Sequence, residues 1–209
     1  MTSRNEMTQP QVTQPLAFVA PEELARANFY GLIARLFYAP PGEQLIAELL
    51  RAPPLEGEAQ LATAWSDMVE GCRNAFPATL EHEHTVLFVG TGKAEVTPYL
   101  SHYVAKDANR NPLVELRQQL AAWGIGRRED VPEYEDHVSG VCEAMRFAIA
   151  VQQRTAEEQR DFFERFVHGS AVAFCDAVSA SKNARFYQPV ARFARAFLDI
   201  EKAAFEMVG

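Results

Sequence analysis

The 209-residue chain has a formal net charge of −8, and 48% of its residues are hydrophobic. This apolar share is ordinary for a globular protein that buries a sizeable core, and the length favours one domain over two. The acidic balance argues against a nucleic-acid partner, because affinity for phosphate backbones comes from lysine and arginine. It fits a basic partner better, but acidic proteins are also common among soluble proteins in general, and before any motif is considered this second interpretation is favoured.

The cysteines and the N-terminal residues bear on the cellular compartment. Cys72, Cys142 and Cys175 are widely spaced and lie in apolar helical patterns, which favours free core thiols in a reducing cytoplasm over disulfides or zinc. No apolar run is long enough for a membrane span, and the polar start of the chain lacks the apolar region of a secretory signal. We expect a disordered polar tail over residues 1–16 and one all-helical domain over residues 17–209.

Apolar residues recur at three- and four-residue steps along almost the whole remaining chain. Helices are expected over residues 21–38, 43–51, 58–76, 77–89, from 98 after a glycine-containing break, 112–123, from about 130 to 149, 155–178 and 185–207. Two capping-box spacings, Asp130 with Glu133 and Thr155 with Glu158, are expected to open two of them. The sequence predicts an all-α fold, a single bundle of about nine to ten helices.

Enzyme motifs are scarce. The letters GTGK at residues 90–93 faintly resemble a phosphate-binding loop, but they lack the full spacing and the Ser or Thr after the lysine. His82 and His84 stand two residues apart on a predicted helix, so they point about 200° apart and cannot ligate one metal together. We expect no metal and no resident cofactor. A metal-dependent hydrolase stays open as an unfavoured alternative, using His82, His84, His102 or His137.

The stretch from residue 83 to residue 103 contains the apolar end of one expected helix, a glycine-bearing loop, and the aromatic start of the next expected helix. Leu87 and Phe88 precede the loop, and Pro98, Tyr99 and Tyr103 follow it. Because the two tyrosines are four residues apart on an expected helix, their rings should face the same way. Tyrosine rings suit a partly hydrated pocket. Together with the acidic stretch at residues 133–137, this pattern predicts a groove for an apolar and basic peptide segment.

A second candidate is the acidic stretch EYEDH at residues 133–137. Carboxylates in a first helical turn are stabilised by the helix dipole, which would account for Glu133 and Asp136 without any function. The alternative is that Asp136 faces a cationic group on a partner, with His137 holding that carboxylate or donating to a peptide carbonyl. The residues alone leave both interpretations open.

The motifs LFVG at 87–90, PYLSHY at 98–103 and EYEDH at 133–137 resemble the TorD/DmsD/NarJ family of redox-enzyme maturation chaperones. The resemblance covers roughly residues 22–205. It implies an all-helical fold, sometimes a domain-swapped dimer, and no catalytic activity. Residues 124–131 are a hypothetical swap hinge, so a homodimer stays open.

The resemblance also implies a function. Family members bind the N-terminal leader of a molybdoenzyme precursor, often a twin-arginine signal, and hold the client in the cytoplasm while its molybdenum cofactor is inserted. By position, it assigns the peptide-binding groove and its polar side to Leu87, Phe88, Pro98, Tyr99, Tyr103, Glu133, Asp136 and His137. The alternative from another class is a helical adaptor that binds a folded partner. The sequence does not identify the client.

Overall fold

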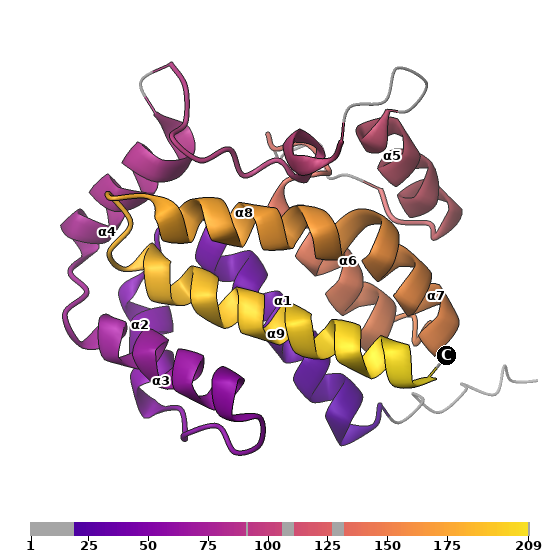
Figure 1. Cartoon of the computed structure of the whole chain (residues 1–209), viewed down its shortest axis with the longest axis horizontal. Helices are drawn as coiled ribbons and strands as arrows, with labels where there is room; N and C mark the ends of the chain where they lie inside the picture. The colour runs from indigo at the N-terminus through magenta and orange to yellow at the C-terminus, as the bar shows by residue number, and fades with distance from the viewer. Residues whose placement is uncertain (1–18, 91, 106–110, 127–131, 209) are drawn as a thin grey trace, which may run out of the picture.

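The structure is a computed structural model that describes residues 19–90, 92–105, 111–126 and 132–208. These parts are helical apart from their connections and one isolated antiparallel bridge (Figure 1). The elements are α1 (Pro21–Tyr38), α2 (Glu43–Arg51), α3 (Ala59–Arg73), α4 (Pro77–His84), the π-helix η1 (Thr85–Val89), the 3₁₀-helix η2 (Leu100–Tyr103), α5 (Pro112–Ala122), α6 (Val138–Ala150), α7 (Ala156–Phe162), the π-helix η3 (Phe163–Val167), α8 (His168–Ala180) and α9 (Tyr187–Val208).

Several of these segments are continuous. Helix α4 runs directly into η1, and α7 runs through η3 into α8. Within the described ranges the chain therefore forms eight helical bodies and one 3₁₀ turn. The predicted all-α class is confirmed, and the number of helices is slightly lower than the nine to ten expected.

Local signals set many of the helix ends. Helix α1 begins at Pro21 with two glutamates in its first turn, where the helix dipole favours them, and it ends before Pro40. The predicted capping box at α7 is confirmed, because the Thr155 hydroxyl accepts from the Glu158 N–H at 3.2 Å and the Glu158 carboxylate accepts from the Thr155 N–H at 3.0 Å. The first two helices span the predicted residues.

Two predicted helix starts are wrong. Tyr99 is extended and only a 3₁₀ turn follows it, and α6 begins at Val138 rather than at about residue 130. The reason is a pairing of distant backbone segments. The Leu100 N–H donates to the Asp136 carbonyl at 2.8 Å, and the Val138 N–H donates to the Pro98 carbonyl at 2.9 Å. These bonds pair backbone N–H and C=O groups of two segments that are extended, although local periodicity predicts helices there. Asp130 lies outside the described residues.

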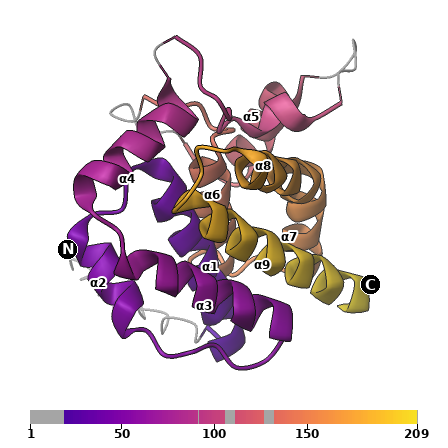
Figure 2. The same ribbon diagram turned by 60° about the vertical axis from the view of Figure 1, so that its left-hand side comes forward.

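Helix α9 lies along α8 and α3, and α1 packs along α6 behind it (Figure 1). In the turned view α2, α3 and α4 gather on one side, with α5 and α7 on the other (Figure 2). Aromatic rings fill the centre, where Tyr30 meets Phe197 edge-on at 4.9 Å and Phe37 meets Phe174 at 5.0 Å between ring centroids. Such pairs add to the stability gained by burial alone.

A buried ionic network joins α1 to α9. The Arg26 guanidinium donates to both carboxylate oxygens of Glu201, at 2.7 and 2.8 Å, and the Tyr30 hydroxyl donates to the same carboxylate at 3.0 Å. Arg26 also donates to the Gln159 amide oxygen at 3.0 Å, which brings α7 into the network. Because every one of these groups would be costly to bury alone, the network fixes how the three helices pack.

The cysteines are buried and free, as expected for core residues. Burial raises the pKa of the Cys72 thiol to about 11 and that of Cys175 to about 12, which keeps both thiols protonated and unreactive at neutral pH. No described helix is both long enough and apolar enough to cross a membrane.

Candidate functional site

The backbone bridge brings Tyr99 beside residues 133–137. Its ring meets the His137 ring edge-on at 5.5 Å between centroids, and its hydroxyl donates to the Glu133 carboxylate. Burial, reinforced by that carboxylate, raises the pKa of Tyr99 well above its usual value. The hydroxyl therefore stays protonated and holds Glu133 against the bridge.

His137 is the N-cap of α6. Its Nδ1 accepts from the Ser139 N–H at 3.2 Å, so that nitrogen carries no proton. Burial lowers the pKa of the ring to about 4, although the nearby Glu133 and Asp136 carboxylates act in the opposite direction. At neutral pH the imidazole is neutral, and its proton is on Nε2.

Asp136 has an unusual environment for a carboxylate, because it is only 4% exposed. One oxygen, Oδ2, accepts weakly from the Ser101 N–H at 3.3 Å, and the other, Oδ1, has no hydrogen-bond partner within the described part of the chain. The side chain borders a small cavity of about 20 Å³ next to Arg165 and Ser170. Asp136 thus retains acceptor capacity that the fold does not use.

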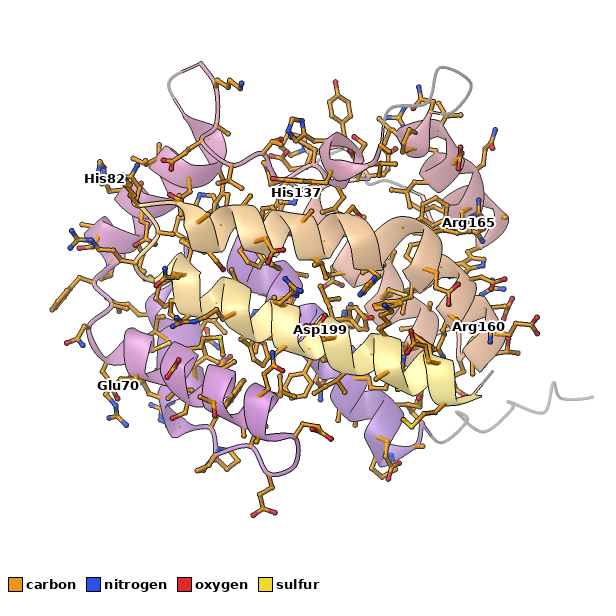
Figure 3. All side chains as sticks on the ribbon, in the orientation of Figure 1. Glu70, His82, His137, Arg160, Arg165 and Asp199 are labelled. Atoms are coloured by element: carbon orange, nitrogen blue, oxygen red, sulfur yellow. The ribbon has the colours of Figure 1, made fainter. Side chains whose placement is uncertain are left out.

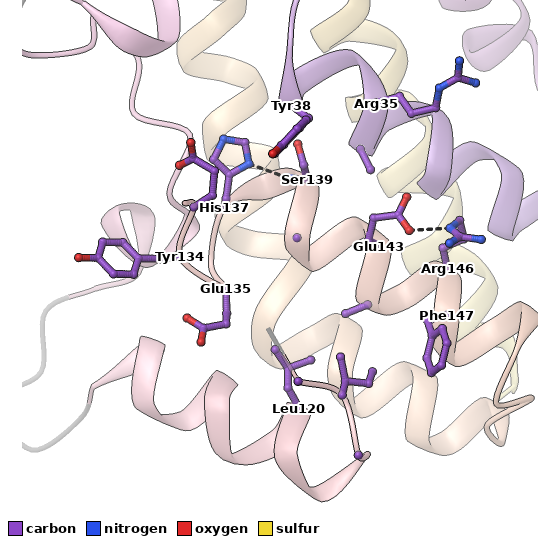
Figure 4. A pocket seen from close by; sticks show the side chains of 17 residues that line it. Arg35, Tyr38, Leu120, Tyr134, Glu135, His137, Ser139, Glu143, Arg146 and Phe147 are labelled. Atoms are coloured by element: carbon purple, nitrogen blue, oxygen red, sulfur yellow. Dashed lines mark hydrogen bonds and ion pairs between the residues drawn. The ribbon is translucent and has the colours of Figure 1, made fainter. Parts of the chain in front are cut away.

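A larger cleft of about 750 Å³ opens on the other side of His137, between α1, α6, the end of α5 and residues 133–137 (Figure 4). It is lined by apolar and aromatic side chains together with charged ones: Ala34, Arg35, Tyr38, Leu120, Ile125, Glu133, Tyr134, Glu135, His137, Glu143, Ala144, Arg146 and Phe147. Tyr38 and Tyr134 are about half exposed at its rim. A cleft of this size and lining can hold an apolar segment with polar groups at its edge.

The eight residues predicted for peptide binding do not form one groove. Glu133 and His137 line the cleft, with Tyr99 and Asp136 beside them. Leu87 and Phe88 lie in the core, and Phe88 packs edge-on against Tyr187 at 5.0 Å. Pro98 is buried next to the bridge. None of these last three residues lines the cleft.

Tyr103 also differs from the expectation. Its ring packs edge-on against Phe174 at 6.2 Å, and its hydroxyl donates to the Thr97 carbonyl at 2.9 Å. Burial raises its pKa to about 12. The expected alignment of Tyr99 and Tyr103 on one helix face is wrong, because Tyr99 is extended and precedes the 3₁₀ turn.

The sequence analysis missed several residues that line the cleft, chiefly Tyr38, Tyr134, Glu135 and Phe147. Tyr134 carried a usable signal, since an aromatic residue between two acidic ones rarely belongs to a core. Tyr38 ends the apolar pattern of α1 and directly precedes a proline-rich stop. Phe147 sits inside a continuous apolar helix pattern and could not be told from a core residue.

The alternatives based on metal or phosphate chemistry gain no support. His82 and His137 lie well apart on different elements (Figure 3), and the described residues contain no group of three or more metal-binding side chains. In the GTGK loop, Thr91 is outside the described residues, and no helix directly follows Lys93. A phosphate-binding loop needs such a helix N-terminus. Gly90 instead makes a tight turn at φ 69°, where an added Cβ would lie 2.1 Å from the Lys93 carbonyl oxygen.

The fold is helical, and the lining of its cleft includes aromatic and acidic side chains. The family model described as nitrate reductase delta subunit matches residues 55–176, more than half of the chain. The chain therefore belongs to this family, which is the TorD/NarJ family of redox enzyme maturation chaperones, and it is a chaperone rather than an enzyme.

Individual relatives agree with the family. The chain is 25% identical over 215 residues to a chaperone protein TorD from Shewanella loihica, covering 93% of this chain and 97% of that protein. A solved structure from Archaeoglobus fulgidus, described as a candidate redox enzyme maturation protein, is similar with a TM-score of 0.53 and 18% sequence identity. It covers 89% of this chain and 99% of its own, and it supports the same TorD-like helical fold.

Proposed function

We propose that the chain binds the N-terminal leader of a molybdoenzyme precursor, of the twin-arginine type, in the cleft between α1, α6 and residues 133–137. The bound client is held in the cytoplasm while its molybdenum cofactor is inserted and it folds, before export or assembly. The observation that carries this proposal is the cleft itself, about 750 Å³, whose lining includes two half-exposed tyrosines and several carboxylates.

The chemistry of such a leader matches the cleft. A twin-arginine leader is a basic segment followed by an apolar one. The apolar segment can pack on Leu120, Ile125 and Phe147, while the basic segment can face the carboxylates at residues 133–135. The net charge of −8 also attracts a basic segment at long range and speeds its association.

Recovery of complexes from the cytosol of the native host tests this function. The tagged full chain is purified, and the bound chains are identified by mass spectrometry. We expect a molybdoenzyme precursor that still carries its leader. Recovery of folded partners that lack leaders would contradict the proposal and favour a helical adaptor instead.

The site within the molecule is tested with a synthetic leader peptide of the recovered precursor and isothermal titration calorimetry. We expect Tyr38→Ala to weaken binding about tenfold, because an exposed aromatic residue at the cleft rim is lost. Phe76→Ala is the matched control, since Phe76 is also a largely exposed aromatic residue but does not line the cleft. Equal affinity of the two variants would show that the leader binds elsewhere.

A further inference from the structure

A guanidinium of the protein itself lies at the acidic edge of the cleft. Arg117, on α5, donates from Nε to Glu135 Oε2 at 3.0 Å, and its Nη2 lies 2.9 Å from the same oxygen. Its Cζ is also 5.9 Å from the centre of the Tyr134 ring. Arg117 is thus held by one carboxylate and one aromatic ring at once.

Glu135 and Tyr134 provide the two features by which proteins recognise arginine. A carboxylate accepts charge-assisted hydrogen bonds from the planar guanidinium, and an aromatic face attracts its positive charge. Both residues line the cleft, whereas Arg117 reaches them from α5. Figure 4 shows Tyr134 and Glu135 at the cleft edge, with the Glu135 carboxylate directed towards α5, the helix that carries Leu120.

Another guanidinium can replace Arg117 at Glu135 and Tyr134. The Arg117 side chain is 44% exposed and that of Glu135 is 18% exposed, so the ion pair is partly open to water and contributes only modestly to stability. Tyr134 is also more than half exposed, so a second guanidinium can reach its ring from solvent. An arginine that arrives on a partner can therefore replace Arg117 without disturbing the core.

From this arrangement we infer that Glu135 and Tyr134 form a binding site for one arginine side chain of the client leader, and that Arg117 occupies this site in the free protein. The inference rests on the proposed leader binding. A leader arginine binds Glu135 and Tyr134 only by displacing Arg117. A peptide segment without arginine does not displace it. Arg117 acts as an internal competitor that lowers affinity for every ligand and favours those that bring their own guanidinium.

The test is a set of calorimetric titrations of the full chain with the synthetic leader peptide recovered with the client. Arg117→Gln removes the competitor, and we expect about threefold tighter binding, as an exposed ion pair permits. Glu135→Gln removes the carboxylate, and we expect about tenfold weaker binding. The double variant should bind as weakly as Glu135→Gln alone, because the competitor matters only while the carboxylate is present.

Two controls make the result specific. Arg73→Gln removes a comparable exposed guanidinium, paired with Glu70 at 2.7 Å outside the cleft, and should leave affinity unchanged. A peptide with its arginines replaced by lysine should lose most of the gain from Arg117→Gln, because an ammonium lacks the planar fork. Thermal unfolding of each variant confirms that the fold is intact.

The outcomes separate the two proposals. A wild-type chain that binds no leader peptide would overturn the proposed function and this inference together. Wild-type binding combined with unchanged or weaker binding of Arg117→Gln would overturn only the inference. An equal gain with the arginine and lysine peptides would also overturn it, because the site would then select charge and not the guanidinium.

Discussion

Two acid–histidine pairs of the same order, Glu83-His84 and Asp136-His137, have both side chains buried. The Glu83 carboxylate accepts three backbone N–H groups at the start of α9, from Arg185 at 2.8 Å, Phe186 at 3.2 Å and Tyr187 at 2.9 Å. The Asp136 carboxylate accepts one N–H at 3.3 Å and keeps one oxygen without a partner.

The two acid–histidine pairs differ in their surroundings, although their residue types are similar. His84 is enclosed by Phe88 and Tyr187 on the closed side of the bundle, whereas His137 lies between Tyr38 and Tyr99 and lines the cleft. Burial lowers the pKa of both histidines. Both pairs therefore serve the start of a helix, α9 and α6, but only the second has a member, His137, that lines the cleft.

The largest expected loss of stability follows from replacing Glu83. Replacing Glu83 with alanine leaves three N–H groups at the start of α9 without their acceptor, and we expect a loss of about 4 kcal/mol in the free energy of unfolding. Urea denaturation measures it. The control Glu81→Ala changes an exposed glutamate on the same helix and should stay within about 0.5 kcal/mol. Similar losses in both variants would contradict the capping role.

The next effect concerns pH. Because the pKa of His137 is about 4 in the folded chain and near 6.5 when unfolded, the unfolded state binds more protons between these values. Stability should therefore fall as pH drops through this window, with His137 contributing about 2 kcal/mol between pH 7 and pH 5.

His137→Asn tests this contribution, since asparagine keeps an N-cap acceptor for α6 but does not titrate. Urea denaturation at pH 7 and pH 5 should show a smaller loss in the variant than in the wild type. The Glu133 and Asp136 carboxylates and His84 also face His137 and remain in both proteins, so the difference isolates the one imidazole. Parallel pH profiles would refute a neutral buried His137.

The smallest expected effect on stability concerns Asp136, next to His137 at the cleft. Asp136→Asn loses only one weak hydrogen bond, so we expect a change in stability of less than about 1 kcal/mol. If the free acceptor faces a cationic group of the leader, affinity for the leader peptide should fall about tenfold. A large loss of stability with unchanged affinity would show that Asp136, like Glu83, is only structural.

The sequence predicts a helix end correctly where a residue within that same turn determines it. Pro21 and the capping box at Thr155 act on their own turns, and α1 and α7 begin as they predict. The bridge between Tyr99 and His137 could not be read, because its hydrogen bonds join segments far apart in the chain. Local periodicity therefore predicts helices from Pro98 and from about residue 130, whereas the structure has extended backbone at Tyr99 and begins α6 at Val138.

The candidate site was predictable in part for the same reason. Glu133 and His137 came from one short motif, and both line the cleft. Tyr38 and Phe147 lie on different helices, and only the packing of α1 along α6 brings them to the same cleft. No spacing in the sequence encodes that meeting. The family resemblance assigns Leu87 and Phe88 to the groove by position, although such an apolar pair on its own is more often part of a core, where the structure has both residues.

The ionic network between α1 and α9 also sets an order of events during synthesis. Arg26 and Tyr30 leave the ribosome early, but their shared carboxylate belongs to Glu201, which is translated much later. Until α9 appears, α1, α3 and α8 lack the helix that packs on all of them. Because α1 also packs along α6, we expect α9 to lock a cleft wall that α6 has already placed, once translation reaches Glu201.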